Sequence, residues 1–158
     1  MYLIFRMLYV LLVSRGKPRL PIEQPSSTLT FRVLPNDIDI NMHMNNGRYL
    51  TICDLSRLDI FIRSGLAKTM IQNKWMPVIS EHTMRYKRSL GLFQKYHIST
   101  KIIDWNEKTF HMEHTFTSVL SGRVVAEGIS KGCVVHKGVV IPPLEVMNVV
   151  TQRLKSKV

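Results

Sequence analysis

The stretch PNDIDINMHMNNGRYL, residues 35–50, decides how the rest of this chain is organised. The segment before it, TLTFRVL (28–34), alternates apolar and polar residues, and this alternation predicts a strand. The segment after it, RYLTICDLSRLDIFIRSGL (48–66), is long, free of proline and rich in apolar residues. It predicts a buried helix that ends at Gly65. The order is therefore strand, polar loop and long helix, with the polar residues gathered at the start of that helix.

The polar loop carries an acid, an amide and an imidazole at two-residue intervals: Asp39, Asn41 and His43. In an extended or loosely turned loop, this spacing points the three side chains to one side. Asn45 or Asn46 can cap the helix. The first N–H groups of that helix lack partners, and they favour an anion or a developing oxyanion. A general base beside an oxyanion site is the minimum equipment for acyl transfer.

The pattern D-x-D-x-N-x-H-x-N-N-x-[RK]-Y, which runs here from Asp37 to Tyr49, resembles the active-site segment of hotdog-fold acyl thioesterases of the 4-hydroxybenzoyl-CoA thioesterase superfamily. Over this loop it is similar to the THEM-type branch and to plant acyl-ACP thioesterases, and the resemblance extends less sharply over residues 28–142. It implies an α+β hotdog fold, in which a curved antiparallel sheet of about five to six strands wraps one long apolar helix. Hotdog domains generally pair sheet edge to sheet edge, so the resemblance also implies a homodimer or homotetramer.

The resemblance implies roles for the three loop residues. Asp39 would be the base that activates water, or the nucleophile that attacks the thioester carbonyl. His43 would polarise water or stabilise charge, and Asn41 would position the substrate. The alternative for Asp39 is a purely structural Asx turn. Asp37 is expected to fix the turn, and Tyr49 is expected to pack.

Substrate contacts are expected at the helix start and in the second strand region. The backbone N–H groups of Asn46 and Gly47 are candidates for the oxyanion site, and Gly47 would let a substrate approach closely. The basic cluster Arg85, Lys87 and Arg88 is expected to hold coenzyme A phosphates or the face of an acyl carrier protein. The alternative for Asn46 and Gly47 is a plain helix cap, and the alternative for the basic residues is that they are only solvated.

The length and the net charge of the chain limit the number of domains and the kinds of partner. A chain of 158 residues suits one domain, and a net charge of +11 favours an acidic partner. That partner is a membrane surface, an acidic carrier protein or the phosphates of coenzyme A. Nucleic acid is not expected, because the chain has no RNP-like aromatic motif, no zinc-finger spacing and no dense basic block.

The first 13 residues, MYLIFRMLYVLLV, are apolar except for Arg6. They are too few to span a membrane, and the positive charges follow the apolar run instead of preceding it as in a signal peptide. Either this helix packs on its own domain or a partner subunit, or it lies in a membrane interface through residues 1–20. We therefore expect an N-terminal helix and linker over residues 1–27, a single hotdog thioesterase domain over residues 28–158, and a cytoplasmic protein with peripheral membrane contact as the open alternative.

Strand-like segments rich in β-branched and aromatic residues follow the long helix, with hairpin-sized connections between them. Together with the first strand they predict an antiparallel meander, to which the short segment VVIP (139–142) is added. The four long segments are residues 77–90, 93–105, 109–120 and 123–137. Residues 66–75 predict a second helix or an ordered loop, and residues 142–155 predict a terminal helix that begins at a proline.

No cofactor or metal is expected. In H-M-E-H (111–114), alternation puts His111 and Glu113 on one strand face and His114 on the other, so the three do not converge. C-V-V-H (133–136) has the same fault. Cys53 and Cys133 fall in apolar segments and are expected to be reduced, buried thiols.

These observations predict an acyl-CoA or acyl-ACP thioesterase that hydrolyses a fatty acyl thioester by water attack assisted by Asp39. The thioester carbonyl would lie at the start of the long helix, and the acyl chain would lie in an apolar tunnel along it. One competitor is a hotdog protein that binds acyl chains or a membrane without turnover. The other is a hotdog hydratase or dehydratase, whose motif D-x-N-P-x-H has one more residue and a proline, unlike D-x-N-x-H here.

Overall fold

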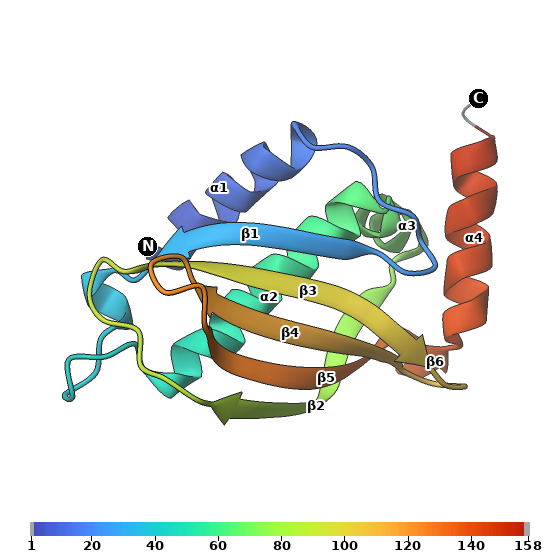
Figure 1. Cartoon of the computed structure of the whole chain (residues 1–158). Coiled ribbons are helices and arrows are strands. Elements are labelled where there is room, and N and C mark those ends of the chain that lie inside the picture. Colours follow the sequence, from blue (N-terminus) through green and yellow to red (C-terminus); the bar gives the residue numbers. More distant parts are fainter. Residues whose placement is uncertain (1, 157–158) are drawn as a thin grey trace.

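The computed structural model describes residues 2–156, in which a curved antiparallel sheet wraps one long central helix (Figure 1). The elements in chain order are α1 (Tyr2–Arg15), β1 (Ser26–Arg32), the 3-10 turn η1 (Pro35–Asp37), α2 (Asn46–Arg63), α3 (Leu66–Asn73), β2 (Met76–Tyr86), β3 (Lys95–Trp105), β4 (Phe110–Ser118), β5 (Val124–His136), β6 (Val139–Ile141) and α4 (Pro143–Lys155). The α+β class, the long central helix and the number of strands confirm the expectation of a hotdog fold. The uncertain segment 66–75 contains a helix.

The expected meander is only partly correct. The strand order is β1-β3-β4-β5-β2, and the short β6 pairs with β5, so β3 to β6 pair in chain order whereas β1 and β2 do not. β2 pairs with β5 and not with β3, and the connection over residues 87–94 carries the chain from β2, at one edge, across to β3. The N–H groups of Lys87 and Arg88 both bind the carbonyl of Val125 in β5. This pairing extends the sheet beyond β5, so that it can close around α2.

The strands alternate between the core and the outer surface of the sheet. In β4, buried Phe110, Met112, His114 and Phe116 alternate with half-exposed neighbours. Irregularities in the pairing of β2 with β5 and of β3 with β4 interrupt the regular ladders, and such bulges increase the twist of a strand. The sheet thereby presents one apolar concave face to α2.

The N-terminal helix α1 packs on α2 and β1 through polar side chains. Arg6 lies between α1 and the rest of the domain, where its guanidinium bonds the Asp37 carboxylate at 2.6 Å and the Arg32 carbonyl at 2.8 Å. Arg6 is 7% exposed and Asp37 is 0% exposed, so this ion pair is buried. Two turns further on, Ser14 donates to the buried carboxylate of Asp59 at 2.6 Å.

The end of α2 is set by Gly65. The helix stops at Arg63, and Gly65 adopts φ 82°, a left-handed conformation that is cheap only for glycine. A Cβ at this position would come within 2.7 Å of the Arg153 guanidinium. None of the helices in residues 2–156 is long and apolar enough to cross a membrane.

Replacing Arg6 with methionine should lower the free energy of unfolding by about 3–5 kcal/mol, because Asp37 would remain as an unpaired buried carboxylate. Urea denaturation monitored by circular dichroism measures this change. Arg15→Met, at the exposed end of the same helix, is the matched control, and it should shift stability by less than about 0.5 kcal/mol. Equal effects of the two substitutions would contradict a structural role for the Arg6–Asp37 pair.

Candidate active site at the start of the central helix

The polar loop between η1 and α2 is a tight hairpin. Ile38 and Met44 form an antiparallel bridge, the Asp39 N–H donates to the His43 carbonyl at 2.9 Å, and the Met42 N–H donates to the Asp39 carbonyl at 3.1 Å. Met42 adopts φ 59°, which turns the chain at the tip. Asp39 and His43 are therefore opposite one another at the neck of a turn.

A second loop holds the hairpin in place. His43 forms a bridge with Gly91, and the Met44 N–H donates to the Leu90 carbonyl at 2.8 Å. This contact brings the connection between β2 and β3 against the hairpin. The departure from meander order thus positions part of the site, because this connection supplies one of its walls.

These elements form a cleft of about 320 Å³. It contains every loop residue predicted to be catalytic, together with Asn46 and two of the three predicted basic residues. Its lining residues are Asp39, Asn41, His43, Met44, Asn46, Tyr49, Tyr86, Lys87, Arg88 and Ser89.

The Asp39 carboxylate is half-buried. Its Oδ1 accepts the N–H of Asn41 at 2.8 Å, so the Asx turn that was the structural alternative is present. Within residues 2–156 its Oδ2 has no hydrogen-bond donor. One oxygen thus orients the carboxylate, and the other is available to a water molecule or a substrate in the cleft.

At the start of α2, Asn45 is the cap. Its side-chain oxygen accepts the N–H of Gly47 at 2.9 Å, so this N–H is already occupied. A Cβ on Gly47 would lie 3.2 Å from the same oxygen, and Gly47 lines a neighbouring depression and not the cleft. The N–H of Asn46 has no acceptor within residues 2–156, and this makes it the better oxyanion donor of the two predicted.

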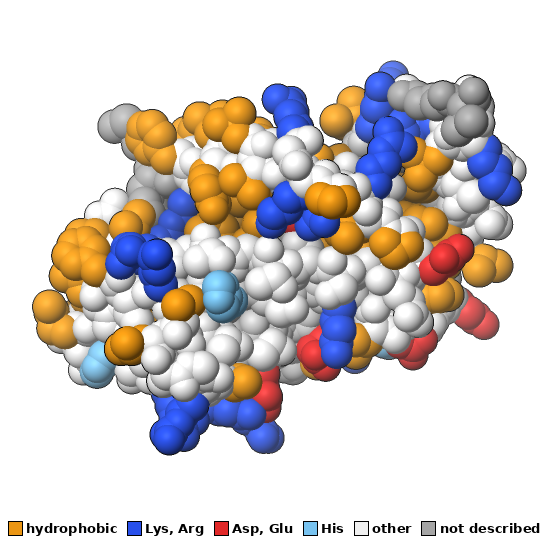
Figure 2. Space-filling view, turned by 45° about the horizontal axis from the view of Figure 1, so that its top comes forward, with side chains coloured by type: hydrophobic (Ala, Val, Ile, Leu, Met, Phe, Trp, Pro, Cys, Tyr) orange, Lys and Arg blue, Asp and Glu red, His pale blue; other side chains and the backbone are white. Residues whose placement is uncertain are grey.

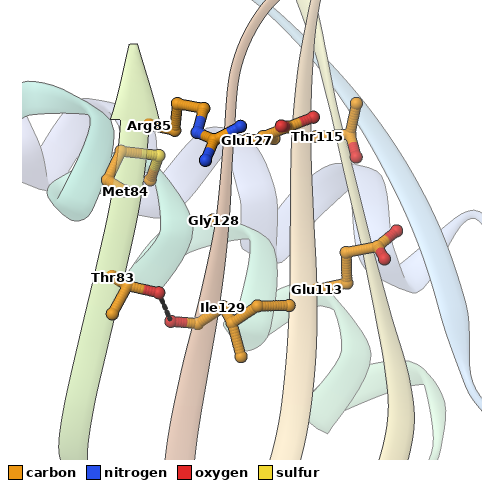
Figure 3. A pocket seen from close by; sticks show the side chains of 8 residues that line it. All are labelled: Thr83, Met84, Arg85, Glu113, Thr115, Glu127, Gly128 and Ile129. Atoms are coloured by element: carbon orange, nitrogen blue, oxygen red, sulfur yellow. Dashed lines mark hydrogen bonds between the residues drawn. The ribbon is translucent and has the colours of Figure 1, made fainter.

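The three predicted basic residues are divided between two hollows. Lys87 and Arg88 line the cleft, whereas Arg85 lies on the outer face of the sheet. Figure 3 shows Arg85 on β2 extending toward Glu127 of β5, with α2 behind the strands. The Lys87 ammonium forms a 2.7 Å ion pair with Glu127. Among residues 2–156, the Arg88 guanidinium has no ion-pair partner.

Two tyrosines close the inner side of the cleft. Tyr49 is 2% exposed and packs edge-to-face on Tyr86, with ring centroids 5.2 Å apart. Burial raises the pKa of Tyr49 to about 12, so it stays protonated and packs, as expected. The Tyr86 hydroxyl donates to the Asn46 carbonyl at 3.0 Å. No pattern in the sequence marks Tyr86, although it lies one residue before Lys87.

Further along α2, a buried hydrogen-bond network joins the helix to the sheet. His114 contacts Thr100 through Nδ1 at 2.8 Å and Ser130 through Nε2 at 2.5 Å. Arg57 lies 3.3 Å from the same Nε2. A guanidinium can only donate, so Nε2 is the acceptor and the proton of the neutral ring lies on Nδ1. Burial, and then the charge of Arg57, lower the pKa of His114 to about 3.

Within residues 2–156 the side chains of Cys53, His82 and His114 converge, with their ligand atoms within 4.8 Å of one another. The chain positions of these residues gave no spacing signal. Both His114 nitrogens are engaged, and the Arg57 charge lies beside one of them, which disfavours a cation at this point. Burial raises the pKa of Cys53 to about 12, so its thiol is neither a ready ligand nor a nucleophile at neutral pH. The contacts favour a structural network.

The fold and the site define the class of protein: a hotdog domain with an acid, an amide and an imidazole at the N-terminus of its central helix. A family model described as the thioesterase-like superfamily matches residues 33–149, and the chain belongs to that superfamily.

Among curated relatives, Protein THEM6 of Danio rerio is 40% identical over 95 residues, which cover 60% of this chain and 47% of that protein. The chain spans about half the length of the curated relatives it matches.

Solved structures share the fold. The probable thioesterase YbaW from Escherichia coli superposes with a TM-score of 0.69 and 21% identity, covering 76% of this chain and 97% of its own. The gentisyl-coenzyme A thioesterase BH1999 superposes with a TM-score of 0.65 and 25% identity, covering 77% of this chain and 98% of its own.

The buried His114 should make stability depend on pH in acid. Its pKa is about 3 in the folded protein against 6.5 for an ordinary histidine, so between these values the unfolded chain binds the additional proton. Stability from this group is fully present above pH 6.5 and is lost as the pH falls toward 3, with a slope of up to about 1.4 kcal/mol per pH unit. Urea midpoints measured across this range should show a flatter profile for His114→Gln than for the wild type.

His111→Gln is the matched control for this experiment, because His111 lies on the outer face of the same strand. It should leave the acid slope of the wild type in place. A His114→Gln profile as steep as that of the wild type would contradict the burial of a neutral imidazole.

Proposed function

We propose that this chain is an acyl thioesterase that hydrolyses an acyl thioester to a carboxylic acid and a thiol. The observation that carries the proposal is the cleft in which Asp39, Asn41, His43 and Asn46 meet at the start of α2. A carboxylate beside an unpaired helix N–H group is suited to generating a nucleophile and stabilising an oxyanion. Membership of the thioesterase-like superfamily supports the same reaction.

In this mechanism the thioester carbonyl lies over the start of α2. Water attacks the carbonyl carbon while the free oxygen of Asp39 takes its proton, and the Asn46 N–H stabilises the oxyanion. Collapse of the tetrahedral intermediate breaks the C–S bond, and Asp39 gives the proton it took from water to the leaving thiolate, which restores its carboxylate. His43 stabilises charge beside Asp39, and Asn41 positions the substrate. Direct attack by Asp39, through an acyl-enzyme anhydride, remains the alternative route.

The proposed substrate is an acyl-CoA. Arg88, an exposed residue that lines the cleft, is the cation best placed for a phosphate, since Lys87 is paired with Glu127. The name of BH1999, a gentisyl-coenzyme A thioesterase, supports the same thiol carrier. An acyl carrier protein is the alternative, because its phosphopantetheine arm presents the same thioester to the cleft.

We propose that the acyl chain lies along α2, between the cleft and the C-terminal half of this helix. At the C-terminal half of this helix an apolar cavity is lined by Ile60, Phe61, Met70 and Met112, among others, but its volume is about 30 Å³. That volume is about the share of one water molecule in the liquid. An acyl chain would therefore have to move side chains aside, and the flexible methionines are the residues that can do so.

We also propose that two copies pair through β2. Within residues 2–156 one edge of this strand has no neighbour, and Met76, Val78, Ile79 and Tyr86 are at least 36% exposed. An exposed, partly apolar edge strand is a template for pairing with another chain. The cleft borders the end of β2, so such a dimer would bring two sites to one interface, and a tetramer would arise by pairing of dimers.

Asp39→Asn should lower kcat for acyl-CoA hydrolysis about 100-fold or more, because the amide cannot take a proton from water. Free-thiol release from a panel of short, long and aromatic acyl-CoAs measures this loss. Asp104→Asn is the matched control, since Asp104 is exposed on β3 and also accepts a neighbouring backbone N–H. It should keep wild-type activity.

Absence of hydrolysis by the wild type on every CoA and carrier-protein ester would overturn the proposal. Retention of a fatty acyl ligand by such an inactive protein would establish the competing acyl-binding function. Loss of the conjugated absorbance of an enoyl-CoA would instead identify a hydratase.

Arg88→Gln should raise KM for an acyl-CoA about tenfold or more, because a hydrogen bond to a charged group contributes roughly 1.5–3 kcal/mol and about 1.4 kcal/mol is a factor of ten. It should leave KM unchanged for the matching acyl-pantetheine thioester, which has no phosphates. Arg85→Gln is the matched control, because Arg85 lies on the outer face of the neighbouring strand end. An increase in KM for Arg85→Gln alone would assign the phosphates to the outer face of the sheet.

A further inference from the structure

The helix α1 directs polar side chains toward the domain and most of its large apolar side chains toward the outside. Its buried positions are Arg6, Val10 and Ser14, which follow one another at intervals of four residues. Large apolar side chains cover its outer face, each with 40–69% of its surface exposed: Leu3, Ile4, Phe5, Met7, Leu8, Tyr9 and Leu12. A surface helix of a water-soluble domain normally shows the reverse pattern, and a contiguous exposed apolar patch marks an interaction site.

The two polar anchors prevent this face from turning inward. Rotating α1 to bury its leucines would expose the Arg6–Asp37 pair and the Ser14–Asp59 hydrogen bond, leaving two buried carboxylates with fewer partners. The apolar face is therefore presented as a fixed part of the folded domain.

The charged residues of the N-terminal segment are all positive. Residues 1–22 contain no acid, and the exposed residues Arg15 and Arg19 lie at the end of the helix and shortly after it. Beside α1 runs an open, largely apolar groove of about 810 Å³, to which the exposed residues Arg32 and Lys95 contribute. Figure 2 shows hydrophobic side chains along the upper left of the molecule bordered by blue ones, with most of the red side chains lower and to the right.

We propose that the outer face of α1 docks on an anionic phospholipid surface, with the helix lying in the plane of the interface. Over its 14 residues, about 21 Å of helix, most of the apolar side chains lie on the outer face and the anchoring side chains lie on the inner face. An apolar helix face with flanking cations is the arrangement that binds at the headgroup boundary. The groove would accommodate part of a lipid, with its phosphate near Arg32 and Lys95.

The charge pattern favours a lipid surface over a second copy of the chain. A two-fold symmetric contact sets the same patch against itself, so an α1–α1 interface would bring the basic residues of both copies together. Like charges facing one another disfavour that assembly, whereas anionic headgroups satisfy the same cations. This inference does not depend on the proposed hydrolysis, because no residue of α1 lines the cleft.

Co-sedimentation of the whole chain with vesicles tests the inference. Vesicles of equal parts phosphatidylcholine and phosphatidylserine should bind the protein, and binding should fall as salt rises from about 0.1 M to about 1 M, because the Debye length shrinks from about 10 Å to about 3 Å. Phosphatidylcholine vesicles should bind it at least tenfold more weakly.

The double variant Phe5→Asp, Leu12→Asp should lower partitioning onto the anionic vesicles about tenfold or more, with the urea midpoint unchanged. Leu144→Asp is the matched control, because Leu144 is 61% exposed on α4, and it should bind as the wild type does. If the α1 variant fails to fold, Arg15→Glu with Arg19→Glu replaces it, and each reversal should weaken binding by at least about fivefold.

Three results would overturn the inference. The first is no vesicle binding by the wild type, and the second is equal loss of binding in the α1 and Leu144 variants. The third is a wild type that ignores vesicles but whose oligomers, measured by sedimentation equilibrium, dissociate on Phe5→Asp, Leu12→Asp substitution. That third result would assign the α1 face to contacts between copies.

Discussion

The arrangement of the site depends on one buried carboxylate, Asp37. It lies where the end of β1, the turn η1 and the helix α1 meet, and its two oxygens bind the Arg6 guanidinium and the Leu34 N–H at 2.9 Å. The Asp37 carbonyl accepts the N–H of Asn45, the residue that caps α2, at 2.8 Å. A fully buried charge is tolerated only when it is paired and hydrogen-bonded, so these contacts have to form together. They fix the position from which the hairpin of Asp39 leaves and the position at which the central helix begins.

The helices and strands of this fold could be predicted because each has a recognisable pattern within its own stretch of sequence. Alternation marks the strands, and a long proline-free apolar run marks α2. The pairing of β2 could not be predicted, because it depends on how the whole sheet closes around that helix and on contacts such as those of Lys87 and Arg88 with Val125. Strand existence is a property of a segment, whereas strand order is a property of the core. The pairing of β2 also affects the cleft, because the long connection after β2 forms one of the cleft walls.

For the site, the resemblance and the spacing selected Asp39, Asn41 and His43, and the structure brings all three to one cleft. Of the two loop shapes expected, extended or turned, the structure has a turned one. The side chains converge because the loop folds back as a hairpin with Met42 in the left-handed conformation. The basic residues are divided in a similar way, because β2 ends at Tyr86. Arg85, within the strand, lines the hollow on the outer face, whereas Lys87 and Arg88, beyond it, line the cleft. Periodicity places residues only while the regular element lasts.

The single charge in the apolar N-terminal run also has a physical explanation that its local sequence does not show. In the sequence Arg6 interrupts an apolar helix, yet its ion pair offsets the desolvation cost of the buried Asp37 carboxylate. Because the partner of Arg6 lies inside the domain, the apolar residues around the rest of α1 have to face outward. The constraint that holds the loop of Asp39 thus also determines which face of α1 is exposed. The Arg6–Asp37 ion pair joins α1 to the turn before Asp39. A surface that binds α1 would therefore act on a helix that is bonded directly to the loop of the cleft.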